Sequence, residues 1–377
     1  MSNKENIPKL RFKEFSGEWE EKATGQVLKI GSGKDYKHLE NGNIPVYGTG
    51  GLMTYVNDYL YDGVSVCIGR KGTIDKPMLL SGKFWTVDTL FYTHSFKESI
   101  PEFIFSIFQK INWKLYNEAS GVPSLSKATI EKVKVNVPKK QEQEKIASFL
   151  SSIDKKINQL SKKDELLQNY KKAMMQKIFS QKLRFKKEDG SDYPKWEKYE
   201  LKEFLIERVE YPEELLPIYS LTIEKGIIPK SERYERAFLV KSDYEYKTMK
   251  ENDFAYNPMN LRFGALARHK EKLDVMVSKY YNIFYCNEKL NSYFAVLYFT
   301  NYNSIQFYNK MATGSLEEKK RVHFREFLKF KFSFPTIEEQ TKIANFLSSL
   351  DTKISQNKKA LEETQRFKKA LLQKMFV

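Results

Sequence analysis

Two stretches of the chain carry apolar residues at alternating steps of four and three, the spacing that lines them up along one side of a helix. Neither glycine nor proline occurs between Lys139 and Asp189, and the first pattern begins soon after Pro138, a residue that suits a helix start. A helix of about 40 residues would form a rod of roughly 60 Å. The apolar positions of this stretch are Ile146, Leu150, Ile153, Ile157, Leu160, Leu167, Met174 and Ile178.

The second stretch follows Pro335 and repeats the first. KIASFLSSIDKKI at residues 145–157 returns as KIANFLSSLDTKI at 342–354, 197 positions later, and YKKAMMQKIF at 170–179 returns as FKKALLQKMF at the same offset. Such a repeat predicts two copies of one structural unit. Because a helix with one apolar seam needs a partner to cover it, we expect the two copies to pair. The second seam consists of Ile343, Leu347, Leu350, Ile354, Leu361, Leu371 and Met375.

Outside these helices the pattern is typical of strands. Short runs rich in β-branched and aromatic residues, such as VSVCIG, WTVDTLFYT and VKVNVP, lie between clusters of Gly, Pro, Asn and Asp. A helical stretch near residues 101–117, and another near 290–310, interrupts the strands. When the two halves are aligned, CIGRKGTI lies opposite NPMNLRFGAL, which places Arg70 opposite Arg262 and Gly72 opposite Gly264.

We therefore predict an α+β fold in which two strand-rich domains are separated by two long helices that form an antiparallel coiled coil with a pseudo-two-fold internal repeat. The antiparallel direction follows from chain order, because the second domain starts where the first helix ends. The alternative is two separate coiled coils with other partners. The predicted strand-rich domains, each with its lead-in, are residues 1–137 and 181–334, and the helices are residues 138–180 and 335–377.

The composition points to a polyanionic partner. Lys and Arg number 64 against 48 Asp and Glu, a formal net charge of +16, and clustered cations gain free energy by releasing counterions from phosphates. A basic but merely soluble protein is the alternative. The two cysteines, Cys67 and Cys286, lie among apolar residues and are predicted to be buried free thiols, and no Cys/His cluster has zinc spacing. The chain has no apolar run of signal or membrane-spanning length, so we expect a cytoplasmic protein.

At this point the chain resembles the specificity subunit of type I restriction–modification systems. The resemblance is carried by the two EQ..KIA.FLSS.D.KI segments at residues 142–157 and 339–354, by their KKA and QK.F ends, and by the LRF…W lead-ins. It implies a non-catalytic subunit that binds double-stranded DNA, in which each strand-rich domain is a target-recognition domain for one half of a bipartite site. It also implies that the helices set the spacing of the halves and dock two methyltransferase subunits, with restriction subunits in the full complex. S-adenosylmethionine, ATP and Mg²⁺ would then act in the partner subunits.

Two other classes of protein compete with this interpretation. A catalytic DNA adenine methyltransferase needs an Asn/Asp-Pro-Pro-aromatic loop, and NPMN at residues 257–260 lacks the second proline and the aromatic residue. A nuclease needs clustered carboxylates for magnesium, but EEK and EKK occur here only in charged, surface-like runs. A structural coiled-coil protein would leave two basic, aromatic-rich domains without a role, and it would show no salt-dependent DNA binding.

The first candidate for DNA binding is the pair Arg70-Lys71, because the flanking Gly69 and Gly72 would let the backbone approach a ligand closely, and the loop with Arg262 is its equivalent in the second domain. Arg, Lys and Asn can contact base edges, while basic and hydroxyl side chains can contact phosphates. Any one of them could equally be an ordinary solvated surface residue. The candidates are Arg70, Lys71, Lys34, Tyr47, Lys76 and Ser124 in the first domain, and Asn260, Arg262, Arg268, Lys319, Lys320 and Arg321 in the second.

The repeated helix starts are the candidate docking surface for partner subunits, because a duplicated surface predicts two equivalent contacts. The residues predicted to form it are Gln143, Lys145, Ile146, Phe149 and Leu150 in the first copy, and Gln340, Lys342, Ile343, Phe346 and Leu347 in the second.

Overall fold

The computed structural model describes residues 6–230 and 246–377, so small parts of both predicted strand-rich domains lie outside the described residues. The chain forms two compact units. The first contains Met1–Asp164 together with Asn357–Val377, and the second contains Glu165–Gln356. Each unit combines strands with helices, which confirms the α+β prediction. The division into four domains stays a prediction.

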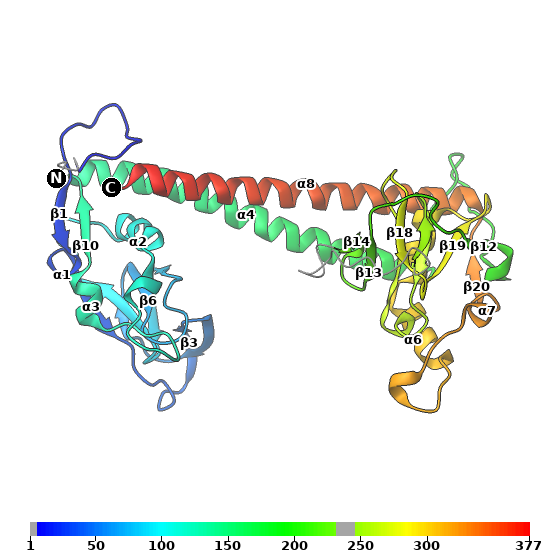
Figure 1. Cartoon of the computed structure of the whole chain (residues 1–377). Helices are drawn as coiled ribbons and strands as arrows, with labels where there is room; N and C mark the ends of the chain where they lie inside the picture. The colour runs from blue at the N-terminus through cyan, green and yellow to red at the C-terminus, as the bar shows by residue number, and fades with distance from the viewer. Residues whose placement is uncertain (1–5, 231–245) are drawn as a thin grey trace. The chain divides into compact units, whose positions relative to one another are not determined.

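The first unit is built on two sheets and a short terminal ribbon (Figure 1). One sheet has the strand order β2-β9-β6-β7, the other has the order β4-β3-β8-β5, and β1 pairs with β10. The strands are β1 (Glu20–Ala23), β2 (Lys29–Ser32), β3 (Asn41–Gly48), β4 (Gly51–Val56), β5 (Tyr61–Asp62), β6 (Ser65–Gly69), β7 (Met78–Leu80), β8 (Lys83–Thr86), β9 (Leu90–His94) and β10 (Lys134–Val137). The helices that complete the globular part are α1 (Thr24–Val27), α2 (Pro101–Lys110), η1 (Trp113–Tyr116) and α3 (Lys127–Lys132).

The second unit repeats this topology. Its main sheet has the order β12-β19-β16-β17, β11 pairs with β20, and the pairs β13-β14 and β15-β18 complete the strands. The strands are β11 (Glu197–Glu200), β12 (Leu205–Glu207), β13 (Tyr219–Thr222), β14 (Gly226–Pro229), β15 (Tyr246–Met249), β16 (Phe254–Tyr256), β17 (Leu266–Arg268), β18 (Val275–Ser278), β19 (Asn282–Cys286) and β20 (Lys331–Phe334). The helices are η2 (Leu201–Glu203), η5 (Leu261–Phe263), α5 (Ser292–Phe299), α6 (Tyr302–Met311), η6 (Glu317–Lys319) and α7 (Phe324–Phe327).

The main sheets of the two units correspond strand by strand, whereas the second sheet of the first unit is matched by two separate strand pairs in the second. β6 and β16 occupy the same place in their sheets, so the loop that carries Arg70 and the loop that carries Arg262 are topological counterparts. Gly72 and Gly264, the glycines of these loops, both adopt a left-handed backbone, with φ of 91° and 94°. The internal repeat predicted from the sequence is thus present in the fold.

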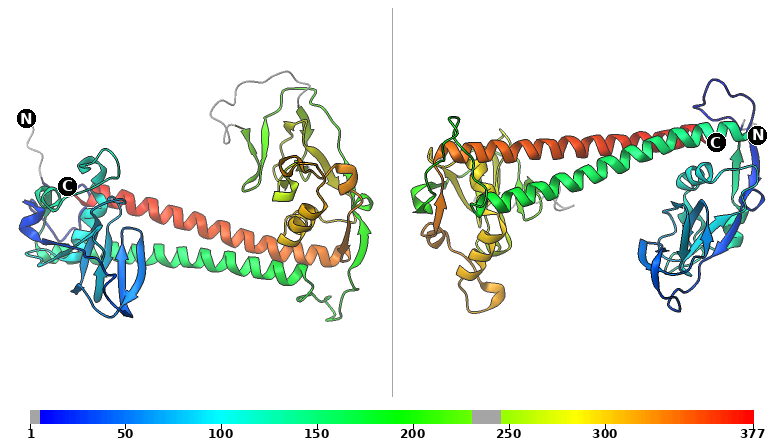
Figure 2. Two further views of the ribbon diagram at one scale, coloured as in Figure 1. Left: turned by 90° about the horizontal axis from the view of Figure 1, so that it is seen from below. Right: turned by 180° about the vertical axis from the view of Figure 1, so that it is seen from behind.

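The two repeats form the long helices α4 (Lys140–Phe179) and α8 (Ile337–Met375), which confirms the helix prediction. Within the first unit the C-terminal part of α8 lies beside the N-terminal part of α4, as both figures show (Figures 1 and 2). Lys368 there bonds Asp154. Within the second unit the same contact recurs between the opposite copies, Lys171 and Asp351. These reciprocal contacts are those of an antiparallel pair.

Each end of the helix pair is embedded in the core of its own unit. In the first unit Ile146 and Leu150 of α4 share a hydrophobic cluster with Leu371 of α8, with Phe376 just beyond its end and with the indole of Trp19. In the second unit the corresponding cluster joins Ile178 of α4, Ile343 and Leu347 of α8, and Trp196. The apolar seam is therefore covered partly by the other helix and partly by the globular part. Each end of the helix pair therefore belongs to the core of a unit.

A hydrogen-bonded group of one arginine, one tryptophan and one buried glutamate, called here the lock, explains the LRF…W lead-ins and the glutamate of the EQ that opens each repeat. In the first unit Arg11 donates to both carboxylate oxygens of Glu142, at 2.8 and 2.7 Å, and the Trp19 indole donates to the same carboxylate at 3.3 Å. Arg184, Glu339 and Trp196 form the same lock in the second unit. These pairings tie each lead-in to the first turn of a long helix.

The glutamine of each EQ forms hydrogen bonds with backbone groups around the start of the long helix. Gln143 donates to the carbonyl of Pro138 at 2.8 Å and accepts from the N–H of Ile100 at 3.1 Å. Gln340 makes the equivalent bonds to Pro335 and Asn291, both at 2.9 Å. A polar side chain that is fully buried has to satisfy its hydrogen bonds in this way. The sequence repeat is therefore first of all a repeat of internal contacts.

Both cysteines are free thiols, as predicted. Cys67 is buried, whereas Cys286 is only partly buried, and burial raises the pKa of both thiols to about 12. Because the thiolate is the reactive form, we expect a disulfide reagent at pH 8 to label neither cysteine readily in the native chain and both rapidly after unfolding. Fast labelling of Cys67 in the native state would contradict this burial.

No helix in the described part of the chain is long and apolar enough to cross a membrane.

Candidate nucleic-acid interface

Three loops of the first unit converge around Arg70 and Lys71, which follow β6. The backbone N–H groups of both residues donate to the carbonyl of Thr89, and the N–H of Leu125 donates to the carbonyl of Arg70 at 2.9 Å. Lys71 also forms a β-bridge with Ser124. The fold therefore brings together three of the sequence-predicted residues, Arg70, Lys71 and Ser124, from segments about 50 positions apart in the chain.

These loops line a cavity of about 520 Å³ whose charged side chains are mainly cationic. Lys127 joins Arg70 and Lys71 there, with Ser32 and Ser124 as hydroxyl donors. Glu118 also lines it, but it is engaged by Ser126 and Thr129, and the Thr129 hydrogen bond is the main cause that lowers the pKa of this carboxyl group. Exposed cations beside hydroxyl groups are suited to phosphate oxygens and base edges.

The glycines of this loop are required by its geometry. A Cβ at Gly69 would lie 2.1 Å from the carbonyl oxygen of Thr73, far inside van der Waals contact, and Gly72 has the left-handed backbone noted above. The tight turn holds the backbone of Arg70 while its side chain stays exposed, with only a 3.5 Å contact to the carbonyl of Asp88. Arg70 is therefore available to a ligand.

The remaining candidates of the first unit differ in accessibility. Lys34 is exposed, and its backbone N–H donates to the carbonyl of Thr86 at the end of β8. Tyr47 is partly buried and packs against a small cluster that includes Cys67 and Phe84. Lys76 is exposed but does not line the cavity.

In the second unit Arg262, the counterpart of Arg70, is buried and contacts other residues of its own unit. It is 8% exposed, its guanidinium bonds the carboxylate and the backbone carbonyl of Glu317, and it lies 4.3 Å above the ring of Phe263. A guanidinium in this position ties the loop after β16 to η6. In the DNA-free chain the structure favours a positioning role for Arg262, although the sequence pairs it with Arg70.

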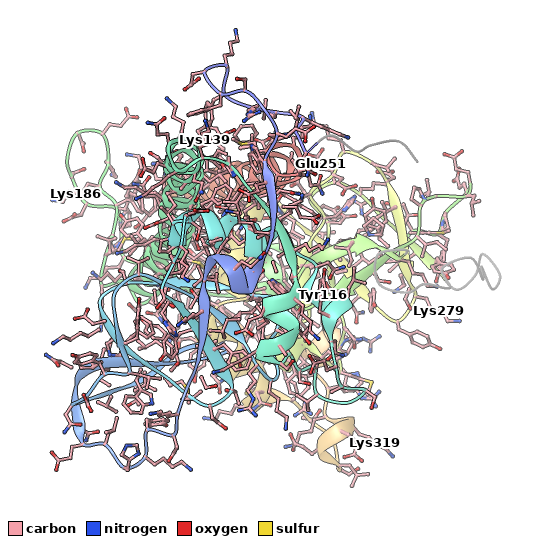
Figure 3. All side chains as sticks on the ribbon, turned by 90° about the vertical axis from the view of Figure 1, so that its left-hand side faces the viewer. Tyr116, Lys139, Lys186, Glu251, Lys279 and Lys319 are labelled. Atoms are coloured by element: carbon pink, nitrogen blue, oxygen red, sulfur yellow. The ribbon has the colours of Figure 1, made fainter. Side chains whose placement is uncertain are left out.

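The other candidates of the second unit do not form one cluster. Asn260 is exposed and lines a cavity of about 430 Å³ with Thr222, Lys225 and Asn257. Arg268 lines a separate cavity of about 720 Å³ and donates to Asn252 and Ser292, and its desolvation lowers its pKa. Lys319, Lys320 and Arg321 lie on or beside η6, a turn that projects from the strands (Figures 1 and 3).

The predicted docking residues divide into internal and surface positions. Gln143, Ile146, Leu150, Gln340, Ile343 and Leu347 are buried within their own unit. Phe149 and Phe346 are partly buried against Phe12 and Phe185 of the lead-ins. Lys145 is exposed and Lys342 is partly exposed, and each lies over an aromatic ring of its lead-in. The periodicity that identified these helices marks the core and cannot by itself identify a docking surface.

Several residues of these sites were missed by sequence reasoning. Lys127 and Ser32 line the first cavity, and Thr222 and Lys225 line the cavity near Asn260. Lys127 opens α3 directly after Ser126, whose side chain caps that helix, so the signal available was a capping serine next to a basic residue. The other three lie on strands or turns with no local signature. Among the described residues, no group of three or more His, Cys, Asp or Glu side chains could hold a metal ion.

A pair of substitutions tests the internal role of Arg262. If the residue positions its loop through Glu317, then Arg262→Ala and Glu317→Ala should impair DNA binding to a similar degree, and the double variant should be little worse than either single one. Binding titrations with the specifically recognised DNA measure this. If Arg262→Ala alone reduces binding, Arg262 reads DNA directly.

Comparison with known proteins agrees with this architecture. A family model, the type I restriction modification DNA specificity domain, matches residues 16–168 and 221–365. The type I restriction enzyme MjaVIII specificity subunit of Methanocaldococcus jannaschii is 24% identical over 344 residues, which are 83% of this chain and 76% of that protein. The type I restriction enzyme EcoprrI specificity subunit of Escherichia coli is 24% identical over 163 residues, or 40% of each chain.

Solved structures share the fold. The crystal structure of a type I restriction–modification S subunit from M. genitalium matches with a TM-score of 0.67 at 13% identity, over 98% of this chain and 99% of that one. A structure from work on complex assembly and conformational transition of the type I R-M system matches with a TM-score of 0.52 at 12% identity, over 95% and 97%. With family-model matches over most of its length, this chain belongs to the type I restriction–modification specificity subunits, which supply DNA recognition and not catalysis.

Proposed function

We propose that each unit reads one half of a bipartite DNA site. The observation that carries this proposal is the duplicated fold: two units with the same strand order present topologically equivalent loops after β6 and β16. In the first unit Arg70 is the residue proposed to contact a base edge, and Lys71, Lys127 and Ser124 would contact phosphates. In the second unit Asn260 is the base-reading candidate, with Lys225 and the basic residues of η6 on the backbone.

In the proposed readout, side chains of different chemistry contact different parts of the DNA. An exposed guanidinium can form two parallel hydrogen bonds to a guanine, and an amide can do the same with an adenine. Lysines and hydroxyl groups position the protein on the phosphates without reading sequence. Because Arg70 and Asn260 differ in chemistry, the two halves of the site are expected to differ.

The helices supply the proposed docking sites for two methyltransferase subunits. Several exposed positions carry the same residue in both copies, which supports two equivalent surfaces. The matching exposed pairs are Ser152 and Ser349, Lys156 and Lys353, Lys172 and Lys369, Gln176 and Gln373, and Lys177 and Lys374. In the assembled complex those subunits would use S-adenosylmethionine, and restriction subunits would use ATP and Mg²⁺.

Native mass spectrometry tests the docking proposal. Charge reversal at one copy, Lys156→Glu, should reduce the methyltransferase subunits bound per chain from two to one at matched concentrations, and Lys353→Glu should do the same at the other site. The double variant should bind none. The exposed Lys83, which lies on a strand of the first unit, offers a control reversal that should leave two subunits bound. One methyltransferase subunit on the unaltered chain would contradict the proposal.

We also propose that the helix pair sets the distance between the half-sites, because α4 begins in the first unit and ends in the second, and α8 runs back. Inserting four residues after Lys163 and four after Lys353 should lengthen the pair by about 6 Å. At about 3.4 Å per base pair, the unspecified spacer should grow by up to roughly two base pairs. Mapping methylated adenines in cells that express the chain with its methyltransferase partner measures both the site and the spacer. Altered half-site bases with an unchanged spacer would refute the proposal.

A further inference from the structure

The tip of the β3-β4 hairpin exposes apolar side chains on both of its faces. Gly48 pairs with Gly51 across the turn, and Leu52 and Met53 follow on β4, with exposed fractions of 50% and 54%. Successive residues of a strand point to opposite faces, so a hairpin that packs one face on a core exposes only one of two neighbours. Here both side chains are about half exposed, so the protein fully covers neither of these two neighbours.

This tip lies directly beside the basic loop of the first unit. A Cβ at Gly72 would be 3.7 Å from the hydroxyl oxygen of Thr49, which is the residue at the turn of the hairpin. Gly72 in turn follows Arg70 and Lys71, and its N–H donates to the carbonyl of Pro123 at 2.8 Å. The apolar tip and the cationic cavity therefore share one surface.

The second unit repeats this juxtaposition with different residues. The β13-β14 hairpin turns at Ile223, which is 56% exposed. The nearest atoms to a Cβ at Gly264, the counterpart of Gly72, include the Ile223 Cγ2 at 4.0 Å. The local sequences, TGGLM at residues 49–53 and TIEKG at 222–226, have little in common beyond the apolar character of the tip. An exposed aliphatic side chain beside the same loop in both units indicates a shared role.

From this geometry we infer that the hairpin tips are apolar wedges that insert at a base step of each half-site and partly unstack it. The inference rests on the proposed function, since it requires that the neighbouring loops bind DNA. Leu52 and Met53 form the wedge of the first unit, and Ile223 forms that of the second. Leucine, isoleucine and methionine are among the side chains that enter base steps in proteins that kink DNA.

The surroundings of the tips favour DNA over a protein partner. A protein-docking surface has an apolar core with few charges. The wedge of the first unit instead lies on a hairpin whose turn residue Thr49 neighbours Gly72, and Gly72 directly follows Arg70 and Lys71 of the cationic cavity. An aliphatic side chain gains nothing from a phosphate, so in such a setting its favourable partner is a base face or a thymine methyl group. Wedge insertion would add to discrimination, because base steps differ in their cost of deformation.

The test uses the complex with its methyltransferase subunits and DNA in which 2-aminopurine replaces single bases of the mapped site, apart from the methylated adenine. With the unaltered chain, fluorescence should rise at a step in each half-site. The Leu52→Ser/Met53→Ser variant should lose the rise in the half read by the first unit, and Ile223→Ser should lose it in the other half, so each variant is the matched control of the other. Affinity should fall about tenfold, with an unchanged dependence on salt because no charge is removed.

The outcomes separate the wedge from the proposed function. Specific binding with no fluorescence rise at any position, or a rise that persists in the variants, overturns the wedge and leaves the proposed function standing. Loss of the methyltransferase subunits from the Leu52→Ser/Met53→Ser variant would show that the tip docks protein and would also overturn it. Absence of any sequence-specific binding by the unaltered complex would instead refute the proposed function. Leu10→Ser, an exposed apolar residue of the lead-in, should change none of these readouts.

Discussion

Replacing Glu339 by alanine should lower the stability of the second unit by about 1–3 kcal/mol. The Glu339 side chain is 0% exposed, and its two oxygens accept hydrogen bonds from Arg184 and from the indole of Trp196. Removing the carboxylate leaves the indole and the partly buried guanidinium without their acceptor, and a donor left unsatisfied in a buried site costs more than an ordinary contact contributes. Thermal unfolding and hydrogen exchange of the lead-in around Arg184 measure the effect.

Glu338 provides a control from the same turn of α8. Its side chain is exposed, so Glu338→Ala should leave the unfolding temperature of the second unit nearly unchanged. Glu142→Ala should reproduce the loss in the first unit, because Glu142 occupies the same lock. Equal unfolding temperatures for Glu339→Ala and Glu338→Ala would mean that the lock contributes little.

Replacing Arg70 by alanine should abolish preference at one position in one half of the DNA site, with a ten- to hundredfold loss of affinity there. A specific contact between an arginine and a base contributes about 1–3 kcal/mol. Arg70 is exposed beside a cationic cavity, and its loop is held by backbone hydrogen bonds that the substitution does not touch. The protein should therefore fold normally, and the other half-site should be recognised as before.

The roles of Arg70 and Lys71 are distinguished by how the affinity of each variant depends on the DNA sequence and on the salt concentration. Lys71→Ala should weaken binding to all sequences alike and reduce the slope of affinity against salt by about one counterion. Arg70→Ala should keep most of the affinity for DNA that already carries the wrong base at its position. A uniform loss across sequences would reassign Arg70 to a phosphate.

The sequence predicted the helices, the repeat and the α+β class because these depend on patterns that are local or self-repeating. A heptad seam can be seen within each helical stretch by itself, and the close similarity of residues 145–157 to 342–354 needs no structure to be recognised. The loop around Arg70 was identified for a similar reason, since two glycines bracket the basic pair.

Other features depended on contacts between distant segments. The roles of Glu142 and Gln143 are set by Arg11, Trp19 and Ile100, and the burial of Arg262 is set by Glu317. No local pattern distinguishes a buried charged residue with a partner from an exposed one. The same limit applies to the predicted docking residues of the helix starts. The repeat shows that both copies share these positions, but it does not show which side of the helix each residue faces.

The first unit is discontinuous in the chain, and this has a consequence for its synthesis. Its core contains Trp19, Phe103 and Ile146, but also Leu371 and Met375 from the far end of α8 and Phe376 just beyond it. The second unit is contiguous from Glu165 to Gln356. On the ribosome, the unit that is begun first therefore cannot be completed until translation has passed residue 376, whereas the second can close earlier. A released chain that is truncated near residue 365 should accordingly contain a protease-resistant second half beside a first half that is still cleavable.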